Sequence, residues 1–142
     1  MTKIQLIVAV YGDLLNPIEF SKIAGVQPTA YWFKNDVIRQ INSPSIEDIT
    51  YLKRKETCWE YSYGYIHTLF FDDISDLFVK QFAPNINTIS DYVNKNNLQT
   101  KIYVVVEIED NETPALYFEN NFLNLILKMN GEIDMDLYVV EK

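Results

Sequence analysis

Three carboxylates at alternate positions near the C-terminus have the spacing that most directly suggests a binding site. Glu132, Asp134 and Asp136 would share one face of a β-strand, roughly 6–7 Å apart, and Tyr138 continues their row. Such a face could begin a hard-cation site or contact a basic protein. We predict no metal site, because calcium usually takes about six to eight oxygen ligands and the chain has no DxDxDG loop. The simplest interpretation is a solvated face whose charges discourage edge pairing, and these four residues are the candidate partner contact.

A row of aromatic residues in the segment 58–68 is the second candidate. The row consists of Trp59, Tyr61, Tyr63 and Tyr65. Rings on one strand face can stack a sugar, a base or another flat ligand. They can equally pack across strands against helices, which is the interpretation that we favour. A ligand groove, if present, would lie beside these rings, and its candidate residues are Trp59, Tyr61, Tyr63 and Lys55.

Nucleophilic catalysis would have to use Cys58 and His67, the single cysteine and the single histidine of the chain. They are nine residues apart, so a regular strand would point them to opposite faces unless a bulge intervened. The chain also lacks G-x-S-x-G, a phosphate-binding loop and G-x-G-x-x-G among its four glycines. Paired carboxylates could exchange protons only if burial separated their pKa values. We predict no catalytic residue and no cofactor, and catalysis is an alternative without positive support.

The bulk properties narrow the classes of partner. The chain has 142 residues, a formal net charge of −8 and a pI near 4.5. A negative field of this size disfavours nucleic acid and anionic membranes as partners, and it suits a basic protein. No apolar run approaches the ~20 residues that a membrane-spanning helix needs. The single cysteine excludes an intrachain disulfide, and we expect a cytoplasmic protein.

The periodicity of apolar residues predicts the elements that must position these side chains. Alternation predicts strands at 4–11, 29–33, 58–68, 102–109 and 132–139. The last of these strands would point Ile133, Met135, Leu137 and Val139 into the core. Helical spacing and capping residues predict helices at 17–24, from 72 to a kink at Pro84, at 86–96 and at 120–130. Asn16 is the expected N-cap of the first helix, and Gly25 follows its end.

The resulting order, β-α-β-β-α-(α)-β-α-β, predicts a single α+β domain over residues 1–142. We expect one layer of mostly antiparallel or mixed sheet with helices packed on one face. Residues 34–57 have the least regular pattern and are expected to form an irregular loop. The basic cluster 53–55 in this loop could bind an anionic patch or simply keep the loop solvated.

Four local patterns then occur in one order along the chain. They are GVQPTAYWFKND (25–36), KETCWEYS (55–62), TPALYF (113–118) and GEIDMDLYV (131–139). Together they resemble the uncharacterised, mainly bacterial family called domain of unknown function 4279. The chain departs from the family pattern at Asn35, where a glycine is usual, but asparagine tolerates a left-handed backbone. The resemblance implies a fold and no established activity.

We therefore expect a non-enzymatic protein that acts by binding a protein partner or by self-association. By analogy with small acidic single-domain proteins, the partner could be a bacterial toxin that this protein neutralises as an immunity protein. The alternative is a small-molecule or metal-binding domain, which could be enzymatic and would use the face of Trp59, Tyr61 and Tyr63.

Overall fold

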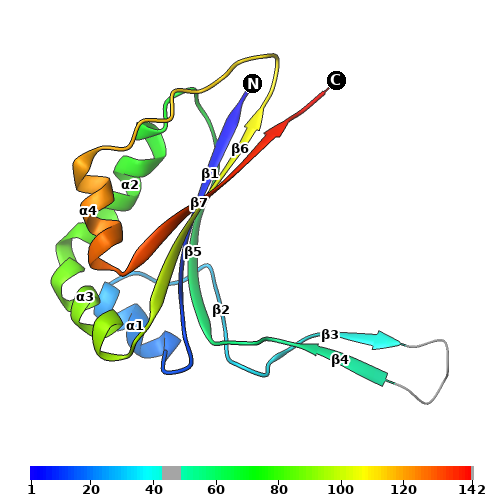
Figure 1. The fold of residues 1–142 in the computed structure, drawn as a ribbon, viewed down its shortest axis with the longest axis vertical. Coiled ribbons are helices and arrows are strands. Elements are labelled where there is room, and N and C mark those ends of the chain that lie inside the picture. Colours follow the sequence, from blue (N-terminus) through cyan, green and yellow to red (C-terminus); the bar gives the residue numbers. More distant parts are fainter. Residues whose placement is uncertain (43–48, 142) are drawn as a thin grey trace.

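The structure is a computed structural model that describes residues 1–42 and 49–141. A twisted five-stranded sheet with helices on one side forms its body (Figure 1). The side chains of residues 39–42 and 49–51 are not described. The five strands of the sheet lie in the order β2-β5-β1-β6-β7. Their bounds are β1 Lys3–Tyr11, β2 Ala30–Trp32, β5 Cys58–His67, β6 Gln99–Ile108 and β7 Gly131–Val139. Neighbouring strands are antiparallel except β6 and β7, which run parallel. The predicted α+β class with a mixed sheet is confirmed.

The helices cover one face of this sheet (Figure 1). They are α1 Pro17–Ala24, α2 Asp72–Phe82, the 3-10 turn η1 Ala83–Asn85, α3 Ile86–Lys95 and α4 Asn120–Lys128. Local signals set the ends of α1 as expected. The Asn16 side chain accepts hydrogen bonds from the backbone N–H groups of Ile18 and Glu19, and Gly25 adopts a left-handed φ of 70°.

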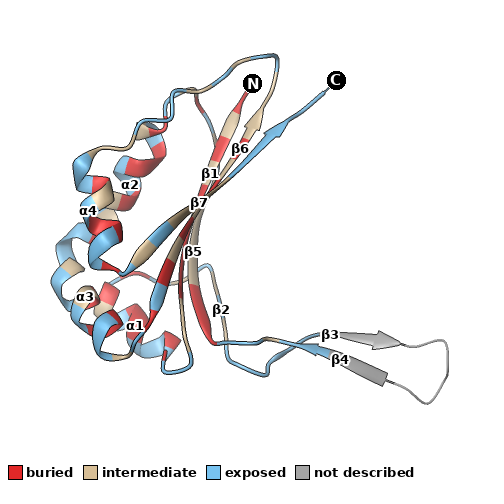
Figure 2. Cartoon of the chain, viewed as in Figure 1, coloured by how far each residue is buried: buried red, intermediate tan, exposed pale blue. Residues whose placement is uncertain are grey.

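The core lies between the helices and the sheet, as the burial colours of Figure 2 show. Ile4, Leu6, Val8 and Val10 alternate along the central strand β1, and each is fully buried. Phe78 of α2 and Phe122 of α4 pack edge to face above them, with ring centroids 5.6 Å apart. Burying apolar area of this kind is the main driving force for the fold.

The closing strand β7 contributes less to the core than its alternation predicted. Ile133 and Met135 pack against the core, but Leu137 is 58% exposed and Val139 is 69% exposed. Figure 2 shows the C-terminal half of β7 as exposed, because the helical layer does not extend over it. Only the first half of the strand therefore has its apolar side covered.

The segment expected to be an irregular loop contains a β-hairpin. Strands β3 Val37–Asn42 and β4 Ile49–Lys53 pair antiparallel in a separate two-stranded sheet that projects away from the body (Figure 1). Residues 43–48 lie outside the described residues. The hairpin pairs with itself and not with the main sheet, so its strands lack the buried alternation by which a strand is recognised. Asn35, at the base, has the left-handed φ of 72° that the family resemblance requires.

Candidate functional site

The face of the sheet opposite the helices is open, and it carries the candidate site. Alternation along β1 sends Ile7, Ala9 and Tyr11 to this face. The strand register places Tyr103 opposite Ile7 and Lys101 opposite Ala9. No helix of the described residues covers this side (Figures 1 and 2). The central strand therefore presents apolar side chains to a face that only the hairpin borders.

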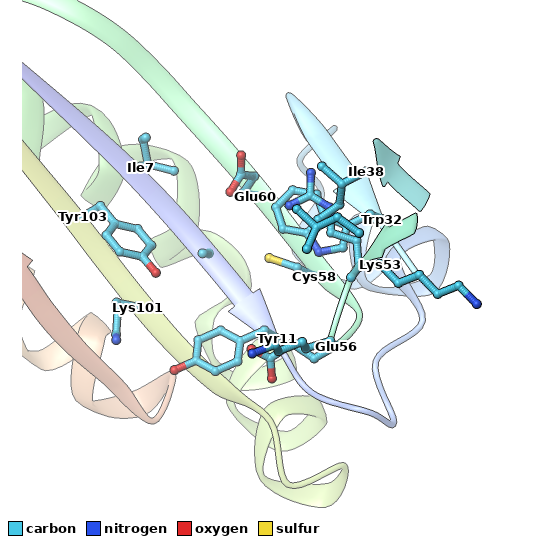
Figure 3. A pocket seen from close by; sticks show the side chains of 14 residues that line it. Ile7, Tyr11, Trp32, Ile38, Lys53, Glu56, Cys58, Glu60, Lys101 and Tyr103 are labelled. Atoms are coloured by element: carbon cyan, nitrogen blue, oxygen red, sulfur yellow. The ribbon is translucent and has the colours of Figure 1, made fainter. Parts of the chain in front are cut away.

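A groove of about 570 Å³ lies between the open face and the base of the hairpin. Figure 3 shows Tyr103 and Lys101 on one side of it and Trp32 and Ile38 on the other, with Cys58 between them. The groove is lined by Ile7, Ala9 and Tyr11 of β1, Cys58 and Glu60 of β5, Lys101 and Tyr103 of β6, and Trp32, Ile38 and residues 52–56. Its floor is thus sheet, and its outer wall is the start and end of the hairpin.

An arginine stacked on a tryptophan forms the outer wall. The Arg54 guanidinium carbon lies 3.9 Å from the ring centroid of Trp32, a cation–π contact. Backbone hydrogen bonds fix the same residue on both sides, since Arg54 N donates to the Asp36 carbonyl and the Arg54 carbonyl accepts from Asn35 N, each at 2.8 Å. The wall is therefore positioned by backbone as well as by the ring contact.

The floor contains a thiol and a carboxyl whose ionisation burial opposes. Burial raises the pKa of Cys58 to about 12, and the charges of Glu60 and Glu56 add to the rise. Burial also raises the pKa of Glu60, while the Arg54 charge acts in the opposite direction. A thiol that stays protonated at neutral pH is a poor nucleophile, so Cys58 acts here as a small apolar group.

The predicted partner contact lies on the same open face, along the edge strand β7. Glu132, Asp134 and Asp136 stand beside Lys101, Tyr103 and Val105 of β6 in the parallel register. Glu132, Asp136 and Tyr138 are exposed and Asp134 is half-buried. None of the ion pairs between described residues includes these carboxylates. We call Glu132, Asp134, Asp136 and Tyr138 the acidic strip.

The metal alternative has no support from side-chain clusters. Within residues 1–42 and 49–141, no group of three or more His, Cys, Asp or Glu side chains is arranged to hold a metal ion.

The predicted aromatic row does not share one face. Trp59 is fully buried under the helices, where its Nε1–H donates a 3.0 Å hydrogen bond to Ser21 Oγ. Tyr61 and Tyr63 pack edge to face against each other beside the core. Tyr65 lies on the open face, because Gly64 has a left-handed φ of 69° and the register with β1 shifts there.

The four candidate ligand residues are therefore divided between two faces. Lys55 lines the groove on the open face, whereas Trp59, Tyr61 and Tyr63 pack on the helix-covered face. The packing interpretation of the rings, favoured from the sequence, agrees with these positions.

The same bulge corrects the expectation for Cys58 and His67. It brings both side chains to the open face, although their odd separation predicted opposite faces. They lie at opposite ends of β5, since Cys58 pairs with Tyr11 and His67 pairs with Lys3 at the other end of β1. The pair cannot act together as nucleophile and base, which need to be within hydrogen-bonding distance.

Several groove residues had no recognisable signal in the sequence. Trp32 and Arg54 are 22 positions apart and meet only because the hairpin returns the chain to its own base. Tyr11 and Tyr103 could have been found, because each lies on the less apolar side of an alternating strand. This less apolar face of β1 and β6 is the signal in the sequence for this part of the groove.

The fold and the groove define a class: an α+β protein built on one mixed sheet, with one helix-covered face and one open face. The chain belongs to the family described as domain of unknown function DUF4279, whose model matches residues 2–140. A search of curated proteins and a search of solved structures found no match. No helix in the described part of the chain has the length and apolar character needed to cross a membrane.

Proposed function

We propose that this protein works by binding a protein partner on the open face of its sheet. The observation that carries the proposal is the uncovered face itself, because a sheet usually buries both faces or exposes a mainly polar one. Here the uncovered face combines half-buried apolar residues such as Ile7 with the tyrosines Tyr65 and Tyr138. Tyrosines at the centre of a contact are frequent energetic anchors in protein interfaces.

The acidic strip supports a basic partner. Its carboxylates have no ion-pair partner among the described residues, and the whole chain has a net charge of −8. Complementary charge raises the association rate and selects against acidic competitors. Tyr138, 54% exposed at the end of the strip, would supply apolar contact.

A toxin that this protein neutralises is the specific partner that we propose within this class. The support is the analogy with small acidic immunity proteins together with an acidic strip suited to a basic enzyme surface. A cytoplasmic location fits the proposal, because the single cysteine is a buried free thiol. Co-expression with genes adjacent to its own, followed by growth measurements, tests the toxin assignment.

Charge reversal tests the binding surface. The wild-type protein is first used to capture a partner from its native cell, and this partner is purified. The double variant Asp134→Lys, Asp136→Lys should then fail to retain the purified partner. The matched control is Asp76→Lys, Asp91→Lys, which makes the same change in net charge at exposed positions on helices α2 and α3. Urea unfolding of both variants establishes that each is folded. Retention of the partner by the folded strip variant would refute the proposal.

A further inference from the structure

We propose that the groove beside Trp32 and Arg54 binds a small amphipathic anion, a molecule with an apolar or aromatic body and one carboxylate or similar group. This proposal goes beyond the protein-partner proposal, and its test residues lie in the groove and not in the acidic strip, so the two can fail separately. The first argument is size. A volume of about 570 Å³ lies within the range of roughly 300–1,000 Å³ that small-molecule sites occupy.

The floor and outer wall suit an apolar body. Ile7 and Ala9 lie in the floor, and Ile38 and Leu52 approach from the hairpin. Although they belong to a wall of the groove, Ile38 and Leu52 are still 43% and 41% exposed. A ligand body placed against them would remove apolar surface from water, which is favourable.

The charges of the lining favour an anion. Among the described residues, four basic side chains line the groove, against two carboxylates, although the chain as a whole is strongly acidic. Lys53 points away from the other lining residues in Figure 3. Arg54, Lys55 and Lys101 remain as the cations of the groove. They still outnumber Glu56 and Glu60, so the net charge of the described lining side chains is opposite in sign to that of the protein.

Arg54 is the residue best prepared to hold the anionic group. The Trp32 ring covers one face of its guanidinium, and the N–H groups of a guanidinium lie along its edge. No ion pair between described residues uses Arg54 or Lys101. A planar carboxylate can accept two parallel hydrogen bonds from such an edge. Because the stack on Trp32 already restricts the Arg54 side chain, less side-chain entropy is lost on binding.

Glu60 provides a test with an effect in the opposite direction. Its half-buried carboxyl lies in the same groove as Arg54 and interacts electrostatically with the Arg54 guanidinium. Replacing it by glutamine removes a negative charge and keeps the shape of the side chain. The substitution should therefore strengthen binding of an anion, which a merely damaged site would not do.

The experiment compares two probes of matched body and opposite charge, 4-phenylbutyrate and 4-phenylbutylamine, by isothermal titration calorimetry. The carboxylate should bind saturably, and the amine at least about tenfold more weakly. Arg54→Gln should weaken carboxylate binding about tenfold or more, and Glu60→Gln should strengthen it. Lys128→Gln, at an exposed position on helix α4, is the control and should leave binding unchanged.

The fluorescence of Trp32 locates the bound probe, since the other tryptophan, Trp59, is fully buried on the opposite face. The carboxylate should change the emission of the wild-type protein and not that of Trp32→Phe. If Arg54→Gln fails to fold, Lys101→Gln replaces it with the same expected weakening. Equal binding of both probes, unchanged binding by a folded Arg54→Gln variant, or no saturable carboxylate binding up to about 10 mM would overturn the proposal.

Discussion

Two glycines with nearly the same left-handed φ and different surroundings allow a sharp test of the local packing. Gly25 ends helix α1 with φ 70°, and Gly64 forms the bulge of β5 with φ 69°. A Cβ added at Gly25 would lie 2.8 Å from Asn85 Nδ2, whereas one added at Gly64 would have no heavy atom within 4 Å. Alanine at both positions should therefore separate the cost of the conformation from the cost of the contact.

The expected magnitudes follow from these contacts. A left-handed alanine costs roughly 1–2 kcal/mol, and the lower entropy of the unfolded alanine chain offsets about 0.4–1 kcal/mol of it. Gly64→Ala should therefore lower the free energy of unfolding by about 1 kcal/mol. Gly25→Ala should also displace the Asn85 amide, which donates a 3.0 Å hydrogen bond to the Ala24 carbonyl. Losing that bond adds about 1 kcal/mol, for a total of about 2 kcal/mol.

Urea unfolding of the two variants measures the difference directly. Asn85→Ala, alone and combined with Gly25→Ala, completes a double-mutant cycle. Because truncation of Asn85 removes both the hydrogen bond and the obstacle, the double variant should lose less stability than the sum of the single variants. Equal losses for Gly25→Ala and Gly64→Ala, or strict additivity in the cycle, would refute the reasoning.

Two further predictions concern ionisation in the groove. Burial raises the pKa of Glu60 above its ordinary value of 4.5, so the folded protein favours the protonated carboxyl. This contribution to the free energy of unfolding is fully present below pH 4.5 and is lost as the pH rises through the raised pKa. Glu60→Gln should therefore raise the free energy of unfolding near neutral pH and flatten its dependence on pH; a profile parallel to that of the wild type would contradict this. Since burial raises the pKa of Cys58 to about 12, iodoacetamide at about pH 8 should alkylate the folded protein at least about a hundredfold more slowly than the urea-unfolded chain. Mass spectrometry measures both rates, and similar rates would show that the thiol is accessible and ionisable.

Features that depend on neighbouring residues could be read from the sequence. Asn16 and Gly25 bracket helix α1 as predicted, because capping hydrogen bonds and a left-handed C-terminal residue involve only the adjacent turn. Ile4 to Val10 alternate into the core for a similarly local reason. The period of a strand determines which side chains share a face, whatever strand lies beside it.

The bulge at Gly64 shows where this local reasoning fails. One left-handed residue reverses the faces of everything after it, so Tyr65 and His67 lie opposite to where strict alternation put them. Nothing in the segment 58–68 distinguishes a bulge glycine from an ordinary strand glycine. The distinction depends on pairing with β1, where the step from Gln5 to Ile7 lies opposite the longer step from Ser62 to Tyr65 in β5.

The acidic strip was identified from the sequence because its residues belong to one strand. Glu132, Asp134 and Asp136 do lie on one face of β7. This face is open only because the helices pack on the other side of the sheet. The apolar side of β7 shows the same dependence. Leu137 and Val139 have the spacing of core residues but remain exposed because the helical layer ends before them.

The amino-acid sequence alone thus established the class of fold, the family and the residues that share a face in the strands without a bulge, such as β1 and β7, since these follow from short-range periodicity and from recurring local patterns. The groove depends on the tertiary structure. Trp32 and Arg54 approach only when the hairpin folds back, and Tyr103 joins them only when β6 pairs with β1. Long-range pairing and the one-sided packing of the helices create this surface, and neither is encoded in the spacing of adjacent residues.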